Sequence, residues 1–103
     1  MPMAFVAAIV ATGAAAQDAG PLAEGRALLD ANCSRCHAID RTDESLHPEA
    51  PAFRTLSARY PVAYLQEALA EGIVTGHSDM PEFSAEPVQI AAIIAYLESI
   101  QSQ

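Results

Sequence analysis

The chain has 103 residues, of which 51% are hydrophobic and only 6% aromatic, with no Trp. This length allows one small domain and leaves no room for a second, which argues against a large buried catalytic cleft. A domain of this size buries only about 60% of the surface of its unfolded chain, so we expect a disulfide, a metal or a cofactor to complete the core. Thirteen acidic residues against five Arg and no Lys give a formal charge of −8, which makes nucleic acid and anionic membranes poor partners.

The first 16 residues are predicted to be a secretory signal peptide. Residues 1–16 carry no charged side chain, and an apolar run ends in Ala14-Ala15-Ala16, which suits cleavage beside small residues. A membrane anchor is the alternative, but the run is shorter than the roughly 20 residues of a spanning helix. No Lys or Arg precedes the run, which leaves open a start upstream of Met1. The mature domain, residues 17–103, is therefore expected to be exported to the periplasm.

A first helix is predicted from Pro21 to about Asn32. Proline is favoured in the first turn of a helix, and Gly25 shares a face with Leu28 and Leu29, which follow three and four residues later. The rest of the chain shows no repeat, no low-complexity segment and no alternating run long enough for a convincing strand. The sequence therefore predicts an all-α domain, with three main helices and long loops wrapped around a ligand.

The motif Cys33-Ser34-Arg35-Cys36-His37 follows this helix and contains both cysteines of the chain. Cys-x-x-Cys-His is the attachment signature of c-type haem. Two thiols three positions apart on a helical turn can each bond one vinyl group of the haem, and the adjacent imidazole is then presented to the iron. The motif predicts haem c held covalently by Cys33 and Cys36, with His37 as an axial ligand of the iron.

Three other roles compete for the cysteine pair. A thioredoxin-like redox pair is expected in a βαβ setting, which this chain lacks. A structural disulfide is compatible with an exported protein, but so short a loop would constrain little of the unfolded chain. A zinc site needs two further Cys or His residues at matched spacing, and His47 and His77 do not provide that spacing.

Irregular chain is expected over residues 37–56, and a second helix is predicted from Pro61 to near Gly72. Glycine suits the left-handed residue that ends a helix. The apolar face of this helix is formed by Val62, Leu65 and Leu69. A second irregular stretch covers residues 75–85. Loops of this length in a small domain are usually functional or wrapped around a ligand.

Met80 is the candidate for the sixth coordination position of the iron. Once the signal peptide is removed it is the only methionine, and it lies in a segment punctuated by Gly76 and Pro81 rather than on a helix face. A methionine with a purely structural role more often occupies an apolar helix position. A thioether is a soft neutral ligand, and Met/His ligation raises the reduction potential of haem iron.

His77 is the rival ligand, because it lies three residues before Met80 and can replace it if the thioether leaves. Otherwise His77 is expected at the surface. His47 is expected to be an ordinary loop residue. We therefore predict His37 and Met80 as the two axial ligands, with His77 held as the alternative to Met80.

A third helix is predicted from Glu86 and Pro87 to about Ile100, and it gives the clearest periodic signal. Its apolar residues recur with the 3.6-residue period of a helix, while polar residues occupy the other positions. The apolar positions are Ile90, Ile93, Ile94, Leu97 and Ile100. This face is expected to pack against the rest of the domain.

The mature domain resembles the class I cytochromes c over essentially its whole length. The residues that carry the resemblance are Gly25-Arg26-Ala27-Leu28-Leu29, the Cys33–His37 motif, Met80-Pro81-Glu82-Phe83 and Ile93-Ile94-Ala95-Tyr96-Leu97. The resemblance implies one haem, a crossing of the first and last helices at Gly25, and a contact of Gly25 and Leu29 with Ile93 and Tyr96.

The resemblance also implies a proline whose carbonyl accepts a hydrogen bond from the proximal imidazole, which orients the ring and raises its basicity. Pro51 is the better candidate, and Pro48 is the alternative. The chain departs from the family in having no Gly-Pro pair to mark this proline.

Filling both axial positions leaves no open place for substrate or oxygen, so we expect an electron carrier rather than an enzyme. Two alternatives stay open: a haem sensor or peroxidase-like domain with a labile sixth ligand, and a cytochrome subunit of a larger oxidoreductase complex. The acidic surface predicts a redox partner with a basic docking patch. The protein is expected to be a monomer or a subunit of such a complex.

Overall fold

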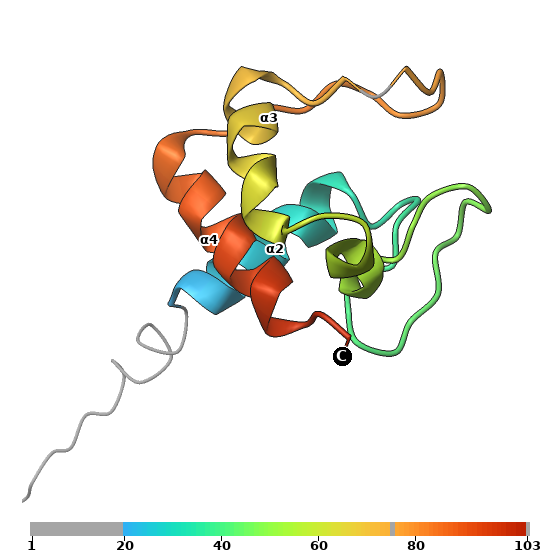
Figure 1. Ribbon diagram of the computed structural model, residues 1–103, viewed down its shortest axis with the longest axis horizontal. Helices are drawn as coiled ribbons and strands as arrows, with labels where there is room; N and C mark the ends of the chain where they lie inside the picture. The colour runs from blue at the N-terminus through green and yellow to red at the C-terminus, as the bar shows by residue number, and fades with distance from the viewer. Residues whose placement is uncertain (1–19, 75, 103) are drawn as a thin grey trace, which may run out of the picture.

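The computed structural model describes residues 20–74 and 76–102, and this part of the chain folds as an all-α domain (Figure 1). The predicted signal peptide, residues 1–16, lies outside the described residues. The elements are α2 (Pro21–Asn32), the 3₁₀ helices η1 (Phe53–Ala58) and η2 (Val62–Tyr64), α3 (Leu65–Glu71) and α4 (Pro87–Ser99). Over the described ranges, strand pairing is limited to a single antiparallel bridge between Ile73 and Phe83. None of the helices described is both long and apolar enough to span a bilayer.

Helix α2 has the bounds that the sequence predicts, with Pro21 in its first turn. Side chains satisfy two carbonyls in its last turns: Asn32 Nδ2 donates to Leu28 O at 2.8 Å, and Ser34 Oγ donates to Asp30 O at 2.6 Å. The backbone N–H of Cys33 donates to Leu29 O at 2.7 Å. The helix therefore passes directly into the turn that carries the cysteines.

Helix α4 also matches its prediction, with Glu86 at the N-cap and Ile100 at the C-cap. A capping box explains where it begins, because Glu86 and Gln89 satisfy each other's backbone N–H groups. All five predicted apolar positions are buried, and Ile93 is the most enclosed, with 1% of its surface exposed. The periodic pattern of the sequence therefore identified the core face of this helix correctly.

Helices α2 and α4 cross at Gly25, as the resemblance implies (Figure 1). A Cβ atom added to Gly25 would lie 2.1 Å from Ala92 O and 2.9 Å from the Cβ of Tyr96. Leu29 and Ile93 lie in the same buried cluster beside this crossing. The backbone of Ala92, which the sequence did not single out, is therefore what leaves no room for a side chain at position 25.

The prediction of one continuous second helix from Pro61 was wrong in its first turn. Pro61 has extended backbone angles, and the chain then makes the 3₁₀ turn η2 before α3 begins at Leu65. Short 3₁₀ turns are common at helix ends, where the chain tightens before the α pattern is established. The predicted end is confirmed, because Gly72 has a φ of 104° and follows α3 as its C-cap.

The stretch after the cysteine motif is more ordered than predicted. Its last residues form η1, which begins at Phe53. Before that, the carboxylate of Asp43 accepts hydrogen bonds from the N–H groups of Ile39 and Asp40, each at 3.0 Å. Arg54 donates to the carbonyl of Asp43 at 2.6 Å. These bonds fold the chain after the motif into a defined loop without regular secondary structure.

The core is one cluster formed by α4 together with residues from the other helices and from the loop after the motif. Its buried members are Leu29, Ile39, Leu56, Val62, Leu69, Ile90, Ile93, Ile94, Tyr96, Leu97 and Ile100. Leu28, Cys33, Phe53, Tyr60, Leu65, Ile73, Phe83 and Ala85 are partly buried and pack against this cluster. The partly buried set includes residues from both long loops, which lie on the same side of the domain (Figure 1).

Candidate functional site

The two cysteines lie on one tight turn at the end of α2. The N–H groups of Cys36 and His37 both donate to Cys33 O, at 3.2 and 3.0 Å. Both thiols are free and half-buried. Burial raises the pKa of the Cys33 thiol to about 11, so at neutral pH it is protonated and a poor partner for thiol–disulfide exchange. The turn therefore presents two unpaired thiols three residues apart.

The imidazole of His37 is fixed by two contacts from the loop that follows it. Its Nδ1 lies 2.8 Å from Pro51 O, and a carbonyl can only accept, so Nδ1 carries the proton. The other ring nitrogen, Nε2, then has the lone pair that a metal needs. Pro51, and not Pro48, is therefore the proline that orients His37.

Phe53 stacks on the His37 ring, with the two ring centroids 4.6 Å apart and the planes 29° from parallel. The backbone N–H of Phe53 donates to Ala38 O at 2.9 Å, which holds the start of η1 beside the motif. Sequence reasoning missed this contact. The available signal was an aromatic residue two positions after the candidate proline, Pro51.

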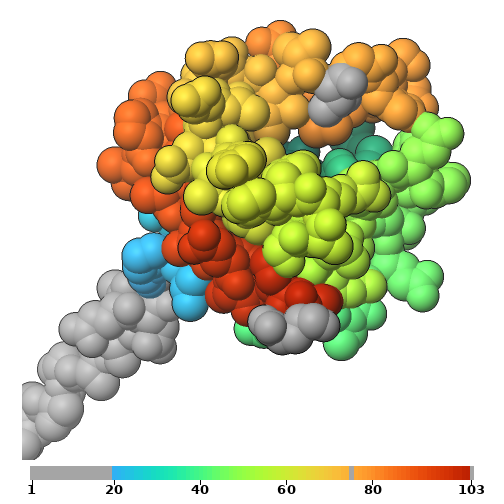
Figure 2. Space-filling view, in the orientation of Figure 1, coloured from blue at the N-terminus to red at the C-terminus, as the bar shows by residue number. Residues whose placement is uncertain are grey.

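Met80 is half-buried in a loop whose base is closed by the bridge between Ile73 and Phe83, where Ile73 N–H donates to Phe83 O at 2.8 Å. Within the loop, Met80 N–H donates to His77 O at 3.1 Å and forms a turn. Figure 2 shows the surface hollowed between this loop, in orange, and the green and yellow-green segments below it. The teal chain that follows α2 is visible at the floor of the hollow.

His77 lies at the surface, as expected, with 39% of its side chain exposed. Its Nε2 bonds to the carboxylate of Glu49, which raises the pKa of His77, and the same bond lowers the pKa of Glu49. His47 Nε2 lies 3.1 Å from Asp79 Oδ2. His47 was expected to be an ordinary loop residue, and the sequence gave no indication that it contacts the segment beside Met80.

A profile of the family described as Cytochrome c matches residues 22–101. The chain belongs to the cytochrome c family. Comparison with curated proteins and with solved structures gave no match. The matched region includes the Cys33–His37 motif, Met80 and most of both crossing helices. Proteins of this family are haem-binding electron-transfer proteins, and their haem c, which contains iron, is covalently attached. The chain is therefore a small c-type cytochrome of class I.

The residues of this cytochrome suit haem c by their chemistry. The described structure supplies two unpaired thiols on one turn, an imidazole whose Nδ1 is occupied, and a half-buried thioether in a separate loop. Partly buried apolar side chains adjoin the core from both long loops, with Phe53 and Phe83, and from the start of α3, with Leu65, and they can cover an apolar ring. Within residues 20–74 and 76–102, no group of three or more His, Cys, Asp or Glu side chains is placed to hold a metal ion.

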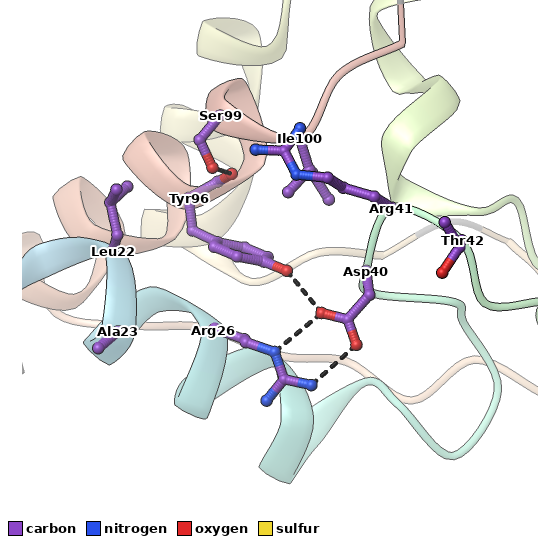
Figure 3. A pocket seen from close by; sticks show the side chains of 9 residues that line it. All are labelled: Leu22, Ala23, Arg26, Asp40, Arg41, Thr42, Tyr96, Ser99 and Ile100. Atoms are coloured by element: carbon purple, nitrogen blue, oxygen red, sulfur yellow. Dashed lines mark hydrogen bonds and ion pairs between the residues drawn. The ribbon is translucent and has the colours of Figure 1, made fainter.

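A second polar cluster of the cytochrome lies at the crossing of α2 and α4 (Figure 3). Arg26 donates from Nε and Nη2 to the two carboxylate oxygens of Asp40, each at 2.8 Å. The hydroxyl oxygen of Tyr96 lies 2.7 Å from Ile39 O and 2.8 Å from Asp40 Oδ1. This cluster joins both helices to the loop that follows the cysteine motif.

These contacts change two pKa values in opposite directions. The hydrogen bond from Arg26 lowers the pKa of Asp40. Burial, reinforced by the hydrogen bond to Asp40, raises the pKa of Tyr96 to about 12. At neutral pH the carboxylate is therefore charged, and the phenol keeps the proton that it donates.

Proposed function

We propose that this cytochrome carries single electrons between redox proteins of the periplasm, on haem c attached to Cys33 and Cys36, with His37 and Met80 as axial ligands. The observation that carries the proposal is the hydrogen bond from His37 Nδ1 to Pro51 O, because it leaves Nε2 to the iron. When bound, haem c supplies one-electron chemistry through its ferric and ferrous states.

The protein residues tune and protect that chemistry. The Pro51 carbonyl raises the basicity of His37, and the stacked Phe53 restricts rotation of the imidazole. The thioether of Met80 favours ferrous iron and so raises the reduction potential. Thioether bonds at Cys33 and Cys36 keep the cofactor in an exported protein.

With both His37 and Met80 bound to the iron, no position would be left for substrate or oxygen, which favours a carrier over an enzyme. A haem sensor or peroxidase-like domain would need Met80 to leave readily. A subunit of a larger oxidoreductase complex would perform the same electron transfer while held by its partners. The formal charge of −8 supports a partner with a basic docking patch.

Two measurements on the holoprotein test the assignment. Acid-acetone extraction should leave haem with the chain, and the ferric protein should show the weak sulfur-to-iron absorption band at the red end of the visible spectrum. Complete extraction of intact haem contradicts covalent attachment. Rapid carbon monoxide binding by the ferrous wild type contradicts stable Met80 ligation and favours the sensor or peroxidase-like function.

Export is tested separately from haem chemistry. The mature chain should be recovered from the periplasmic fraction with Gln17 as its first residue, because cleavage is predicted after Ala16. Recovery of the uncleaved chain with the membrane fraction supports the anchor instead.

A further inference from the structure

Two short segments that are far apart in the sequence exchange side-chain hydrogen bonds reciprocally. His47 Nε2 lies 3.1 Å from Asp79 Oδ2, and His77 Nε2 bonds to Glu49 Oε1. The two histidine rings meet edge to face, with centroids 5.6 Å apart and planes at 82°. We call these four residues, His47, Glu49, His77 and Asp79, the loop clamp.

Each half of the loop clamp is oriented by its own backbone. Glu49 N–H donates to His47 Nδ1 at 3.1 Å, and Asp79 N–H donates to His77 Nδ1 at 3.2 Å. Because Nδ1 accepts in both rings, the proton of each neutral imidazole lies on Nε2 and is directed to the carboxylate of the other segment. Each segment therefore contributes one donor and one acceptor in the same local geometry.

The loop clamp is connected on both sides to residues of the proposed haem site. On one side, His47 N–H donates to Cys36 O at 3.1 Å, which joins the segment to the cysteine turn. On the other side, Met80 N–H donates to His77 O at 3.1 Å, and Asp79 directly precedes Met80. A short path of hydrogen bonds thus runs from the backbone of the attachment motif to the backbone of Met80.

We propose that His47 and Glu49 are positioning residues, which hold the Met80 loop over the attachment motif and slow the departure of the thioether from the iron. The proposal rests on the proposed function, since it takes Met80 as the axial ligand. The bridge between Ile73 and Phe83 closes the base of the loop, and the loop clamp attaches the part nearest Met80. Neither His47 nor Glu49 belongs to that loop, and their side chains contact it through the hydrogen bonds to Asp79 and His77.

The test is the rate at which imidazole displaces Met80 in the ferric holoprotein, followed by loss of the sulfur-to-iron band. We expect the double variant His47→Ala/Glu49→Ala to lose Met80 about fivefold faster than the wild type, because two partly exposed side-chain pairs are removed. The variant His47→Gln/Glu49→Gln retains a donor and an acceptor of similar reach, and it should return most of the way to the wild-type rate.

A matched control separates positioning from general loosening. Arg26→Ala removes an exposed ion pair at the crossing of α2 and α4, and it should leave the displacement rate unchanged. The single variants His47→Ala and Glu49→Ala, each expected to give a smaller acceleration, decide the matter if the double variant fails to load haem. Global unfolding of every variant is measured by far-ultraviolet circular dichroism on the same samples.

The outcomes distinguish a failure of Met80 ligation from a failure of the positioning role. A wild type without the sulfur-to-iron band overturns Met80 ligation, and the positioning role with it. A wild type with the band, whose double variant exchanges imidazole at the wild-type rate, overturns the positioning role alone. Equal acceleration in Arg26→Ala also overturns it, because the effect would then be general. Acceleration confined to the clamp variants, with recovery in the glutamine pair, supports it.

Discussion

Gly25 and Ala92 bring two helices together backbone to backbone: a Cβ atom on Gly25 would lie 2.1 Å from the carbonyl oxygen of Ala92. This separation is far below any van der Waals contact, and the obstacle is main chain of α4 rather than a flexible side chain. Any larger residue at position 25 must therefore push α4 away from α2. The displacement would reach Leu29 and Ile93, which lie in the same buried cluster.

Gly25→Ala is expected to lower the free energy of unfolding of the holoprotein by about 2 kcal/mol, because the overpacking cost exceeds the gain in helix propensity. Denaturant unfolding measures the change. Gly20→Ala is the control for the added Cβ, which would meet nothing there within 4 Å. Because Gly20 is the N-cap of α2, where Gly is preferred over Ala, a smaller loss of stability is expected from it. Equal stability of Gly25→Ala and the wild type would show that the helices can separate without cost.

The sequence predicted those parts of the fold that depend on local pattern. The bounds of α4 followed from apolar periodicity ending at Ile100, and the bounds of α2 from Pro21 and the cysteine motif. The 3₁₀ turn before α3 was not predicted, because a proline such as Pro61 is compatible with the start of an α-helix and with extended chain before a 3₁₀ turn. Local sequence signals therefore predicted the type of each element more reliably than the conformation of its first turn.

The sequence predicted less of the site, because its supporting contacts join segments distant in the chain. The Cys33–His37 motif was evident from spacing alone. By contrast, the hydrogen bond between His47 and Asp79 links residues 32 positions apart, and neither residue belongs to a recognisable motif. The stacking of Phe53 on His37 likewise depends on how the intervening loop folds.

Asp40 is expected to make stability depend on pH. Its pKa in the folded protein is lowered, chiefly by the hydrogen bond from Arg26, so its contribution is present above the unfolded pKa of about 3.9 and is lost as the pH falls through the folded value. Asp40→Asn should therefore be less stable than the wild type at pH 6, and the difference should shrink below about pH 4. Thermal unfolding across this range measures it, and a difference independent of pH would contradict the linkage.

Covalent haem should be required for a stable fold. Cys33→Ala and Cys36→Ala should each weaken haem retention in acid-acetone, and the chain without haem should be largely unfolded, because so small a core loses its central filler. Far-ultraviolet circular dichroism of the haem-free chain measures the helix content. A haem-free chain with the helix content and cooperative melting of the holoprotein would show that the apolar cluster suffices.

Met80→Ala should abolish the sulfur-to-iron band, open the iron to cyanide or carbon monoxide, and lower the reduction potential. His77 can then replace the thioether only after its Nε2 is released from Glu49. A bis-histidine spectrum in Met80→Ala should therefore become stronger when Glu49→Ala is added and disappear when His77→Ala is added. Persistence of that spectrum in Met80→Ala/His77→Ala would assign the replacement ligand to another residue.

The acidic surface should govern how fast the cytochrome meets its redox partner. Arg26 and Arg54 form ion pairs with Asp40 and Asp43, and the other three arginines stand against the other 11 acidic side chains. Haem propionates add further negative charge, and redox encounters are commonly small and electrostatically steered. A partner with a basic patch should therefore be favoured.

The dependence of the electron-transfer rate on salt distinguishes electrostatic steering from a negative charge that serves only solubility. Screening acts over about 10 Å at 0.1 M salt, so added salt should slow electron transfer with the basic partner while leaving reduction by a small neutral reagent almost unchanged. Stopped-flow kinetics at increasing ionic strength measures both reactions on the same holoprotein. The neutral reagent reports any direct effect of salt on the haem site, so only the difference between the two slopes measures steering. Equal partner rates at low and high salt, or faster transfer to an acidic partner, would leave the net charge without a role in electron transfer.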